Sequence, residues 1–124
     1  MADPTLTDEQ RVARIDDQLA HVWMVRRFLK HCDEAEDDPE LQEVTRDLYD
    51  FMLALGPART EKNDALYLKQ AKKKLRKLCK ATEMFVAIQP EVSGHTNFAM
   101  AARSLHLAVG AIADLVEGTE REAY

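Results

Sequence analysis

Apolar residues recur every three or four positions in four segments of the chain, with polar residues between them. An α-helix makes one turn in about 3.6 residues, so this spacing gathers the apolar side chains of each segment on one helical face. The pattern predicts four amphipathic helices, over 8–34, 39–55, 61–89 and 95–117. The sequence between these segments has no run of alternating apolar and polar residues, the pattern that indicates a β-strand.

Capping residues and prolines mark the expected ends of these helices. Thr7 opens a stretch with the pattern of a capping box, and Asp38 before Pro39 suits an N-cap followed by a first helical turn. Proline lacks the backbone N–H that a helix interior needs, so the second and third helices are expected to stop at prolines. These expected stops are Gly56-Pro57 and Gln89-Pro90.

Four such helices joined by short connections bury their apolar faces most simply against one another. The sequence therefore predicts an all-α fold, a single-domain antiparallel (up-down) four-helix bundle over residues 1–124 with short disordered ends. The expected buried faces are Val12, Ile15, Leu19, Val22 and Leu29; Leu41, Val44, Leu48, Phe51 and Leu55; Leu68, Ala71, Leu75, Leu78, Thr82 and Phe85; and Phe98, Ala101, Leu105, Ala108, Ile112 and Leu115.

Composition adds the expected environment of the protein. The 124 residues are 46% hydrophobic and 31% charged, as in ordinary soluble domains, and the net charge of −5 disfavours a dedicated nucleic-acid binder. The N-terminus lacks the pattern of a secretory signal, and no uncharged apolar segment approaches the roughly 20 residues of a membrane helix. We therefore expect a cytoplasmic protein that does not enter a membrane and keeps Cys32 and Cys79 reduced.

One arc of the third expected helix is strongly basic and lies opposite the apolar seam. Such an arc is a candidate surface for a polyanion such as RNA, because clustered cations recruit phosphates. The alternative is a solvated face, offset by seven carboxylates between residues 33 and 43. The arc consists of Lys69, Lys72, Lys73, Arg76, Lys77 and Lys80.

Arg26 is expected on the buried face of the first helix, where an unpaired guanidinium would be costly. The helix can diverge from the core so that the side chain reaches solvent. Otherwise Arg26 pairs with an internal carboxylate or with a bound anion, because its planar fork suits such partners.

Polar residues are also expected to gather at one end of the bundle, where the first helix ends and the fourth begins. Together with Arg26, His31, His95 and Asn97 are the candidate ligand-binding residues at this end. A simple N-cap made by Thr96 or Asn97 is the alternative.

The same end holds residue types that bind transition metals, namely His31, Cys32 and His95. Metal sites in helical bundles place two ligands on one helical face, and no pair of these residues has that spacing. The sequence therefore predicts no metal site and no cofactor.

Enzyme motifs such as a phosphate-binding glycine loop are missing from the sequence. Arg26 and His31 have an R-x4-H spacing that is similar to the one in the HEPN family of four-helix ribonucleases and nucleotide-binding toxins. In that family the polar pair serves RNA cleavage, which makes Arg26 and His31 the candidate catalytic residues. The resemblance covers two residues and lies on the first helix, whereas the family carries its pair late in the bundle, so we do not assign the chain to that family.

The leading hypothesis is a non-enzymatic interaction or scaffold module that binds itself or another protein. It depends on apolar residues outside the main seams, since an exposed apolar patch often marks a partner surface. A polyanion or RNA binder, with or without ribonuclease activity, is the alternative, and a small-ligand site at the bundle end is the third hypothesis. The apolar residues are Met24, Phe28, Tyr49, Met52, Met100, Leu107 and Ala111.

Overall fold

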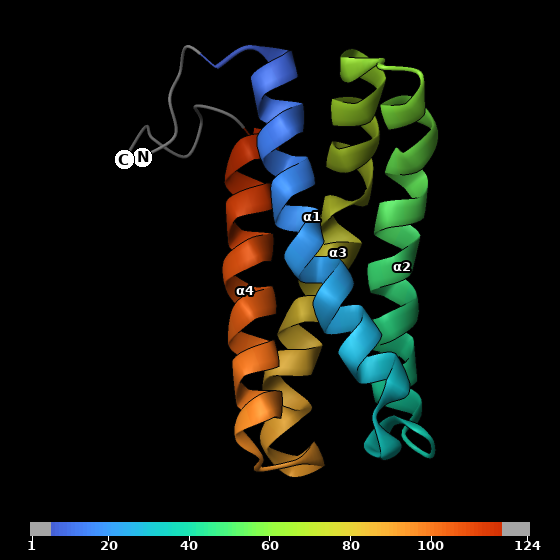
Figure 1. The fold of residues 1–124 in the computed structure, drawn as a ribbon, viewed down its shortest axis with the longest axis vertical. Coiled ribbons are helices and arrows are strands. Elements are labelled where there is room, and N and C mark those ends of the chain that lie inside the picture. Colours follow the sequence, from blue (N-terminus) through green and yellow to red (C-terminus); the bar gives the residue numbers. More distant parts are fainter. Residues whose placement is uncertain (1–5, 118–124) are drawn as a thin grey trace.

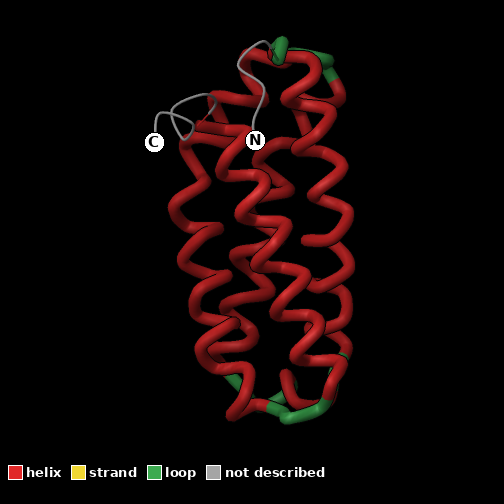
Figure 2. The backbone as a smooth tube through the Cα atoms, turned by 90° about the vertical axis from the view of Figure 1, so that its left-hand side faces the viewer, coloured by secondary structure: helices red, strands yellow, loops and turns green. Residues whose placement is uncertain are grey.

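The protein is described from a computed structural model that covers residues 6–117. Within this range the chain is helical and contains no strand, so the predicted all-α class is confirmed. Figure 1 shows the long helices side by side, and the turned view in Figure 2 shows the same lengthwise arrangement. The elements are α1 (Asp8–His31), the short 3-10 helix η1 (Asp33–Ala35), α2 (Pro39–Thr60), α3 (Asp64–Val92) and α4 (Thr96–Glu117).

Successive long helices run in opposite directions in Figure 1. Helix α1 crosses the view obliquely: its start lies beside the end of α4, and its end lies close to the start of α2. Arg11 fastens the first of these contacts, since its Nε and Nη2 donate to the carbonyl oxygens of Leu115 and Val116 at 2.9 and 2.8 Å. The oblique course brings the last turns of α1 next to α2 and η1.

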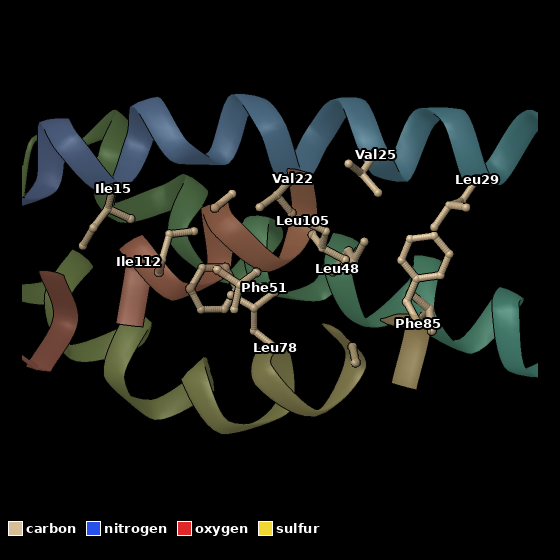
Figure 3. Packing of buried hydrophobic residues seen from close by; sticks show 14 of the residues in the cluster. Ile15, Val22, Val25, Leu29, Leu48, Phe51, Leu78, Phe85, Leu105 and Ile112 are labelled. Atoms are coloured by element: carbon tan, nitrogen blue, oxygen red, sulfur yellow. The ribbon is translucent and has the colours of Figure 1, made fainter. Parts of the chain in front are cut away.

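Side chains from all four long helices meet in one core. Val22, Phe51, Leu78 and Leu105, one from each helix, point toward one another in Figure 3. Each fully buried leucine or phenylalanine favours the folded state by roughly 1.5–3 kcal/mol, so this shared core holds the helices together. Most expected seam residues are buried, whereas four lie at the margin of the core: Leu19, Leu68, Leu75 and Leu115.

Several buried residues were not on the expected faces. Tyr67 is 1% exposed, although its neighbour Leu68 was the expected core residue. Helical spacing alone does not say how each helix is rotated about its axis against its neighbours. A small rotation buries residues at one edge of the apolar stripe and moves residues at the other edge toward solvent. The other buried residues outside the expected seams are Val25, Ala35, Ala58, Ala81, Ala102, Val109 and Val116.

Helix α1 ends at His31, three residues before its expected end at 34. Thr7 caps its start as predicted, with Oγ1 accepting from the N–H of Gln10 at 3.1 Å and the N–H of Thr7 donating to the Gln10 side chain at 2.9 Å. At the other end Cys32 adopts an extended backbone conformation, with φ −83° and ψ 148°, which breaks the helix. The chain then turns through η1 toward Asp38, the N-cap of α2.

The expected ends of α2 and α3 at their prolines are wrong. Helix α2 continues through Pro57 to Thr60, and α3 continues through Pro90 to Val92. A proline inside a helix loses one hydrogen bond, but continuing α2 places Ala58 in the core at 2% exposure. Gly56 leaves open space where a Cβ would lie, so the surface of α2 is uncrowded at this point. Tertiary packing therefore outweighs the local cost of Pro57.

A Schellman motif connects α2 to α3. The N–H of Asn63 donates to the carbonyl of Ala58 at 2.9 Å, and the N–H of Lys62 donates to that of Arg59 at 3.1 Å. Lys62 occupies the left-handed region with φ 56°, a position that glycine usually fills. Asn63 then caps α3, because its side chain accepts from the N–H of Leu66 at 3.1 Å.

By length and composition alone, α4 is apolar enough to cross a membrane. Its apolar residues include Phe98, Leu105 and Ile112, which are at most 4% exposed because they pack against the other helices. The core helix of a bundle meets the same length and composition criteria, and the sequence did not single out this segment.

Lys62→Gly should stabilise the fold, because a side chain in the left-handed region costs roughly 1 kcal/mol that glycine does not. We expect a rise of up to about 1 kcal/mol in the free energy of unfolding, measured by urea denaturation. Lys69→Gly, in the middle of α3, serves as the opposite control and should destabilise the protein by a similar amount. A fall in stability for Lys62→Gly would show that the lysine side chain contributes more than the backbone strain removes.

Candidate binding surface between helices α1 and α2

Arg26 lies on α1 between the buried residues Val25 and Leu29 but does not enter the core. Its guanidinium carbon lies 4.5 Å from the ring centre of Tyr49 and 5.2 Å from that of Trp23. Cation–π contacts of this kind favour the charged group where it is partly removed from water. The guanidinium thus leaves the core along an aromatic wall made by α1 and α2.

The hydrogen bonding of Arg26 is incomplete. Its Nε is buried without a hydrogen-bond partner, and no carboxylate of the described residues forms an ion pair with it. The internal carboxylate considered from the sequence is therefore not found within residues 6–117. A buried donor without a partner is costly, and the guanidinium also has no anionic partner among the described residues, so its charge remains available to an anion from outside.

Trp23 and Tyr49 are unusually exposed for aromatic residues, at 43% and 39%. Trp23 projects from α1 and Tyr49 from α2, and Arg26 contacts both rings. Tryptophan, tyrosine and arginine are the residues that most often dominate the energy of protein interfaces. We call Trp23, Arg26 and Tyr49 the aromatic–arginine cluster.

A polar hollow of about 610 Å³ lies at one end of this cluster, between the end of α1, η1 and the first half of α2. Its cationic lining comes from Arg26 and Lys30 of α1 and Arg46 of α2, with His31 beside them. The carboxylates of its lining are those of Asp33 and Glu36, in and directly after η1. The remaining lining residues are Cys32, Ala35, Gln42, Thr45 and Tyr49.

An apolar hollow of about 420 Å³ also lies between α1 and α2, nearer the start of α1. Trp23 lines it together with Leu19 and Met52, and Leu55 forms part of its wall. The aromatic–arginine cluster thus stands between a polar and an apolar hollow of the same face. The other lining residues are Asp16, Ala20, Gly56, Arg59, Thr60 and Tyr67.

A polar triad borders the apolar hollow. The Nε of Arg59 lies 3.4 Å from Oδ2 of Asp16, and the hydroxyl of Tyr67 donates to Oδ1 of the same carboxylate at 3.5 Å. Burial, and secondly the negative charge of Asp16, raise the pKa of Tyr67 far above its usual range. Asp16, Arg59 and Tyr67 therefore connect α1, α2 and α3.

The structure brings only part of the expected ligand-binding cluster together. Arg26, His31 and Cys32 line the polar hollow, whereas His95 and Asn97 are not among its lining residues. The end of α1 and the start of α4 do lie at the same pole of the molecule (Figure 1). His95 and Asn97 therefore lie at the same pole as Arg26 and His31 without lining the same hollow.

His95 itself caps α4, in place of the expected Thr96 or Asn97. Its Nδ1 accepts from the N–H of Asn97 at 3.0 Å, and its carbonyl accepts from the N–H of Phe98 at 3.0 Å. The ring therefore satisfies one of the free N–H groups at the start of the helix.

The candidate metal ligands are not grouped. Among residues 6–117, no three His, Cys, Asp or Glu side chains come close enough together to hold a metal ion. The Cys32 thiol donates to the carbonyl of Leu29 at 3.1 Å, and burial raises the pKa of this thiol. The raised pKa favours the neutral thiol, which is a weaker nucleophile than the thiolate.

The basic arc on α3 is exposed along most of its length. Lys77 alone of the six forms an ion pair with a described carboxylate, at 3.5 Å from Asp47 and 3.9 Å from Asp50 of α2. The other five cations have no ion pair within residues 6–117, so the acidic segment 33–43 does not neutralise them by direct contact.

The apolar residues expected outside the seams divide into two groups. Met24, Tyr49, Met100 and Leu107 are exposed, the last at 62%. Phe28, Met52 and Ala111 are half-buried instead, and Phe28 packs edge-to-face on Phe98 with ring centres 5.0 Å apart.

Trp23 and Arg46 are site residues that the sequence did not predict. Trp23 could have been noticed, because it lies one turn before Arg26 and projects from the polar side of the helix. Arg46 carries no such signal, since only the packing of α2 on α1 brings it to the hollow that Arg26 lines.

Comparison with known proteins found no family model, no curated protein and no solved structure that matches the chain. The resemblance of Arg26 and His31 to the HEPN pattern gains no support from this comparison.

The Tyr67 hydroxyl should make stability fall in alkali. Because its pKa is raised in the folded protein, stability from the neutral hydroxyl is present below the ordinary pKa of about 10 and is lost as pH rises beyond it. The wild type should lose up to about 1.4 kcal/mol per pH unit from this group. Urea unfolding above that pH should show a smaller loss for Tyr67→Phe, whereas Tyr49→Phe should behave as the wild type. Equal losses in all three proteins would contradict this assignment.

Proposed function

We propose that this chain is a non-enzymatic interaction module of the cytoplasm that self-associates through the face formed by α1 and α2. The proposal treats the chain as a single-domain antiparallel four-helix bundle, an arrangement supported by the alternating direction of successive helices and the shared core. In this arrangement the core holds α1 and α2 rigidly, and their outer face presents the aromatic–arginine cluster.

The observation that carries the proposal is the exposure of Trp23 and Tyr49 on either side of Arg26. Covering the exposed part of each ring would favour binding, because burial of large aromatic surface lowers the free energy strongly. The guanidinium of Arg26 already contacts both rings, so less side-chain entropy remains to be lost on binding.

A second copy fits this face because the face carries both a projecting ring and an apolar hollow. In a two-fold dimer the same patch meets itself, so Trp23 of each copy could enter the hollow lined by Leu19, Met52 and Leu55 of the other. Because Trp23 and the apolar hollow lie side by side on one face, two copies of this face can each offer a ring to the hollow of the other.

Trp23→Ser should weaken self-association. An aromatic anchor at an interface commonly contributes at least about 2 kcal/mol, which corresponds to roughly thirtyfold in the dimer dissociation constant. Sedimentation velocity over roughly 1 µM to 1 mM protein should show a monomer–dimer equilibrium for the wild type and a shift toward monomer for the variant.

Leu107→Ser on α4 is the matched control, because Leu107 is exposed but lies outside the α1–α2 face. Its dissociation constant should equal that of the wild type. A wild type that stays monomeric over the whole range would remove the self-association hypothesis, and an equal effect of both variants would place the interface elsewhere.

A polyanion-binding role of α3 is the second candidate, favoured by the five arc cations without an ion pair in the described residues. Binding of single-stranded RNA through these five cations should then weaken by a factor of about 100 between about 50 and 200 mM salt. Neutralising Lys72, Lys73 and Arg76 together should abolish it. Absence of binding at the lower salt concentration would exclude this role.

A further inference from the structure

We propose that the polar hollow at the end of α1 binds a small soluble phosphate monoester that also carries hydroxyl groups. This site differs from the apolar hollow used for self-association, and the inference does not depend on the proposed function. Its volume of about 610 Å³ lies within the range of roughly 300–1000 Å³ typical of small-molecule sites.

The neutral side chains of the hollow have largely used their hydrogen-bond donors within the protein. Both amide hydrogens of Gln42 are engaged, since Nε2 donates to the carbonyls of Ala35 and Glu36 at 2.8 and 2.9 Å. The Thr45 hydroxyl donates to the carbonyl of Gln42 at 2.8 Å, and the Cys32 thiol donates to that of Leu29 at 3.1 Å. Among the other side chains of the lining, Tyr49 and His31 keep a donor that is not engaged within the described residues.

The donors that remain for a ligand therefore belong mainly to cationic groups. Arg26, Lys30 and Arg46 form no ion pair with any carboxylate of residues 6–117, and His31 adds a further nitrogen. Charged donors form stronger hydrogen bonds to anionic oxygens than neutral donors do. Three cations on two walls suit a phosphate, which offers three oxygens and up to two negative charges, better than a carboxylate.

Arg26 is the best positioned of these cations. Its contacts with the rings of Trp23 and Tyr49 fix the guanidinium before any ligand arrives. Its Nε is buried and has no partner, so this nitrogen is not open to a ligand, whereas Arg26 lines the hollow and has no ion pair inside residues 6–117. An anion in the hollow would accept from the terminal nitrogens of this guanidinium and balance its charge.

The carboxylates of Asp33 and Glu36 favour a ligand that carries hydroxyl groups away from its phosphate. Both are exposed and line the same hollow without an ion pair inside the described chain. They would repel a ligand that is anionic throughout, whereas they would accept hydrogen bonds from hydroxyl groups. A phosphate at one end and hydroxyls at the other thus match both kinds of charge in the lining.

The test uses glycerol 3-phosphate as the probe and the full chain at constant ionic strength. Isothermal titration and chemical-shift mapping should show saturable binding, with the largest shifts at residues 26–36 and 42–49. Glycerol without phosphate should not bind, and inorganic phosphate should bind more weakly than glycerol 3-phosphate. Equal affinity for the two phosphates would overturn the role given to Asp33 and Glu36.

Arg46→Gln is the decisive variant, because Arg46 is exposed and its replacement should leave the core intact. Loss of one charged hydrogen-bonding group should weaken binding by about tenfold or more. Arg26→Gln should weaken it at least as much. Arg103→Gln on α4, also exposed and outside the hollow, is the matched control and should bind as the wild type.

Two results would overturn the proposal: no saturable binding by the wild type, or binding that Arg46→Gln and Arg103→Gln weaken equally. Shifts confined to residues 69–80 would likewise overturn it, because they would place the anion on the basic arc of α3. Self-association measured on the same variant keeps the two proposals separate, since Arg46→Gln should weaken phosphate binding and leave the dimer unchanged.

Discussion

Burial of four apolar stripes in one shared core is the constraint on which the rest of this structure depends. An amphipathic helix in a protein takes most of its stability from the packing of its apolar face, so each helix needs its neighbours to cover Val22, Phe51, Leu78, Leu105 and the other core residues. The same demand carries α2 through Pro57, since Ala58 gains a place in the core. It also fixes the oblique course of α1, and with it the face shared by α1 and α2.

Arg26 shows how a polar residue shapes this face. Val25 and Leu29 must be buried, so the arginine between them stays near the core whatever its own preference. Tyr49 and Trp23 provide a route outward that keeps the charge on aromatic surface. Both rings thereby remain partly exposed, and the guanidinium remains without a carboxylate among the described residues. Burial of Val25 and Leu29 thus leaves a candidate binding surface of two exposed rings and an arginine without an ion pair in the described residues.

Much of the fold could be predicted from the sequence, because periodicity reports directly on which residues of a helix share a face. The capping box at Thr7 and the N-cap at Asp38 were likewise readable, since both depend on neighbours within four residues. Helix ends at Pro57 and Pro90 were not, because tertiary packing overrode the local signal. His95 was not predicted as the cap of α4 for a different reason, because Ser, Thr, Asp and Asn are the usual N-cap residues.

The candidate site was less predictable than the fold. Arg26 could be singled out because helical phase places it on the apolar face, and His31 because it lies at the end of the first helix. Arg46 could not, since its place depends on how α2 is rotated and shifted against α1. His95 and Asn97 do not line the hollow of Arg26 and His31, because a shared pole does not specify distances between side chains.

The fluorescence of Trp23 tests the central claim most directly, because it is the only tryptophan of the chain and lies in the proposed interface. Quenching of its emission by acrylamide can be measured from low to high protein concentration. If the α1–α2 face binds a second copy, quenching should fall as concentration rises, since Trp23, which is 43% exposed, becomes covered. Quenching that stays the same at every concentration would contradict self-association through this face.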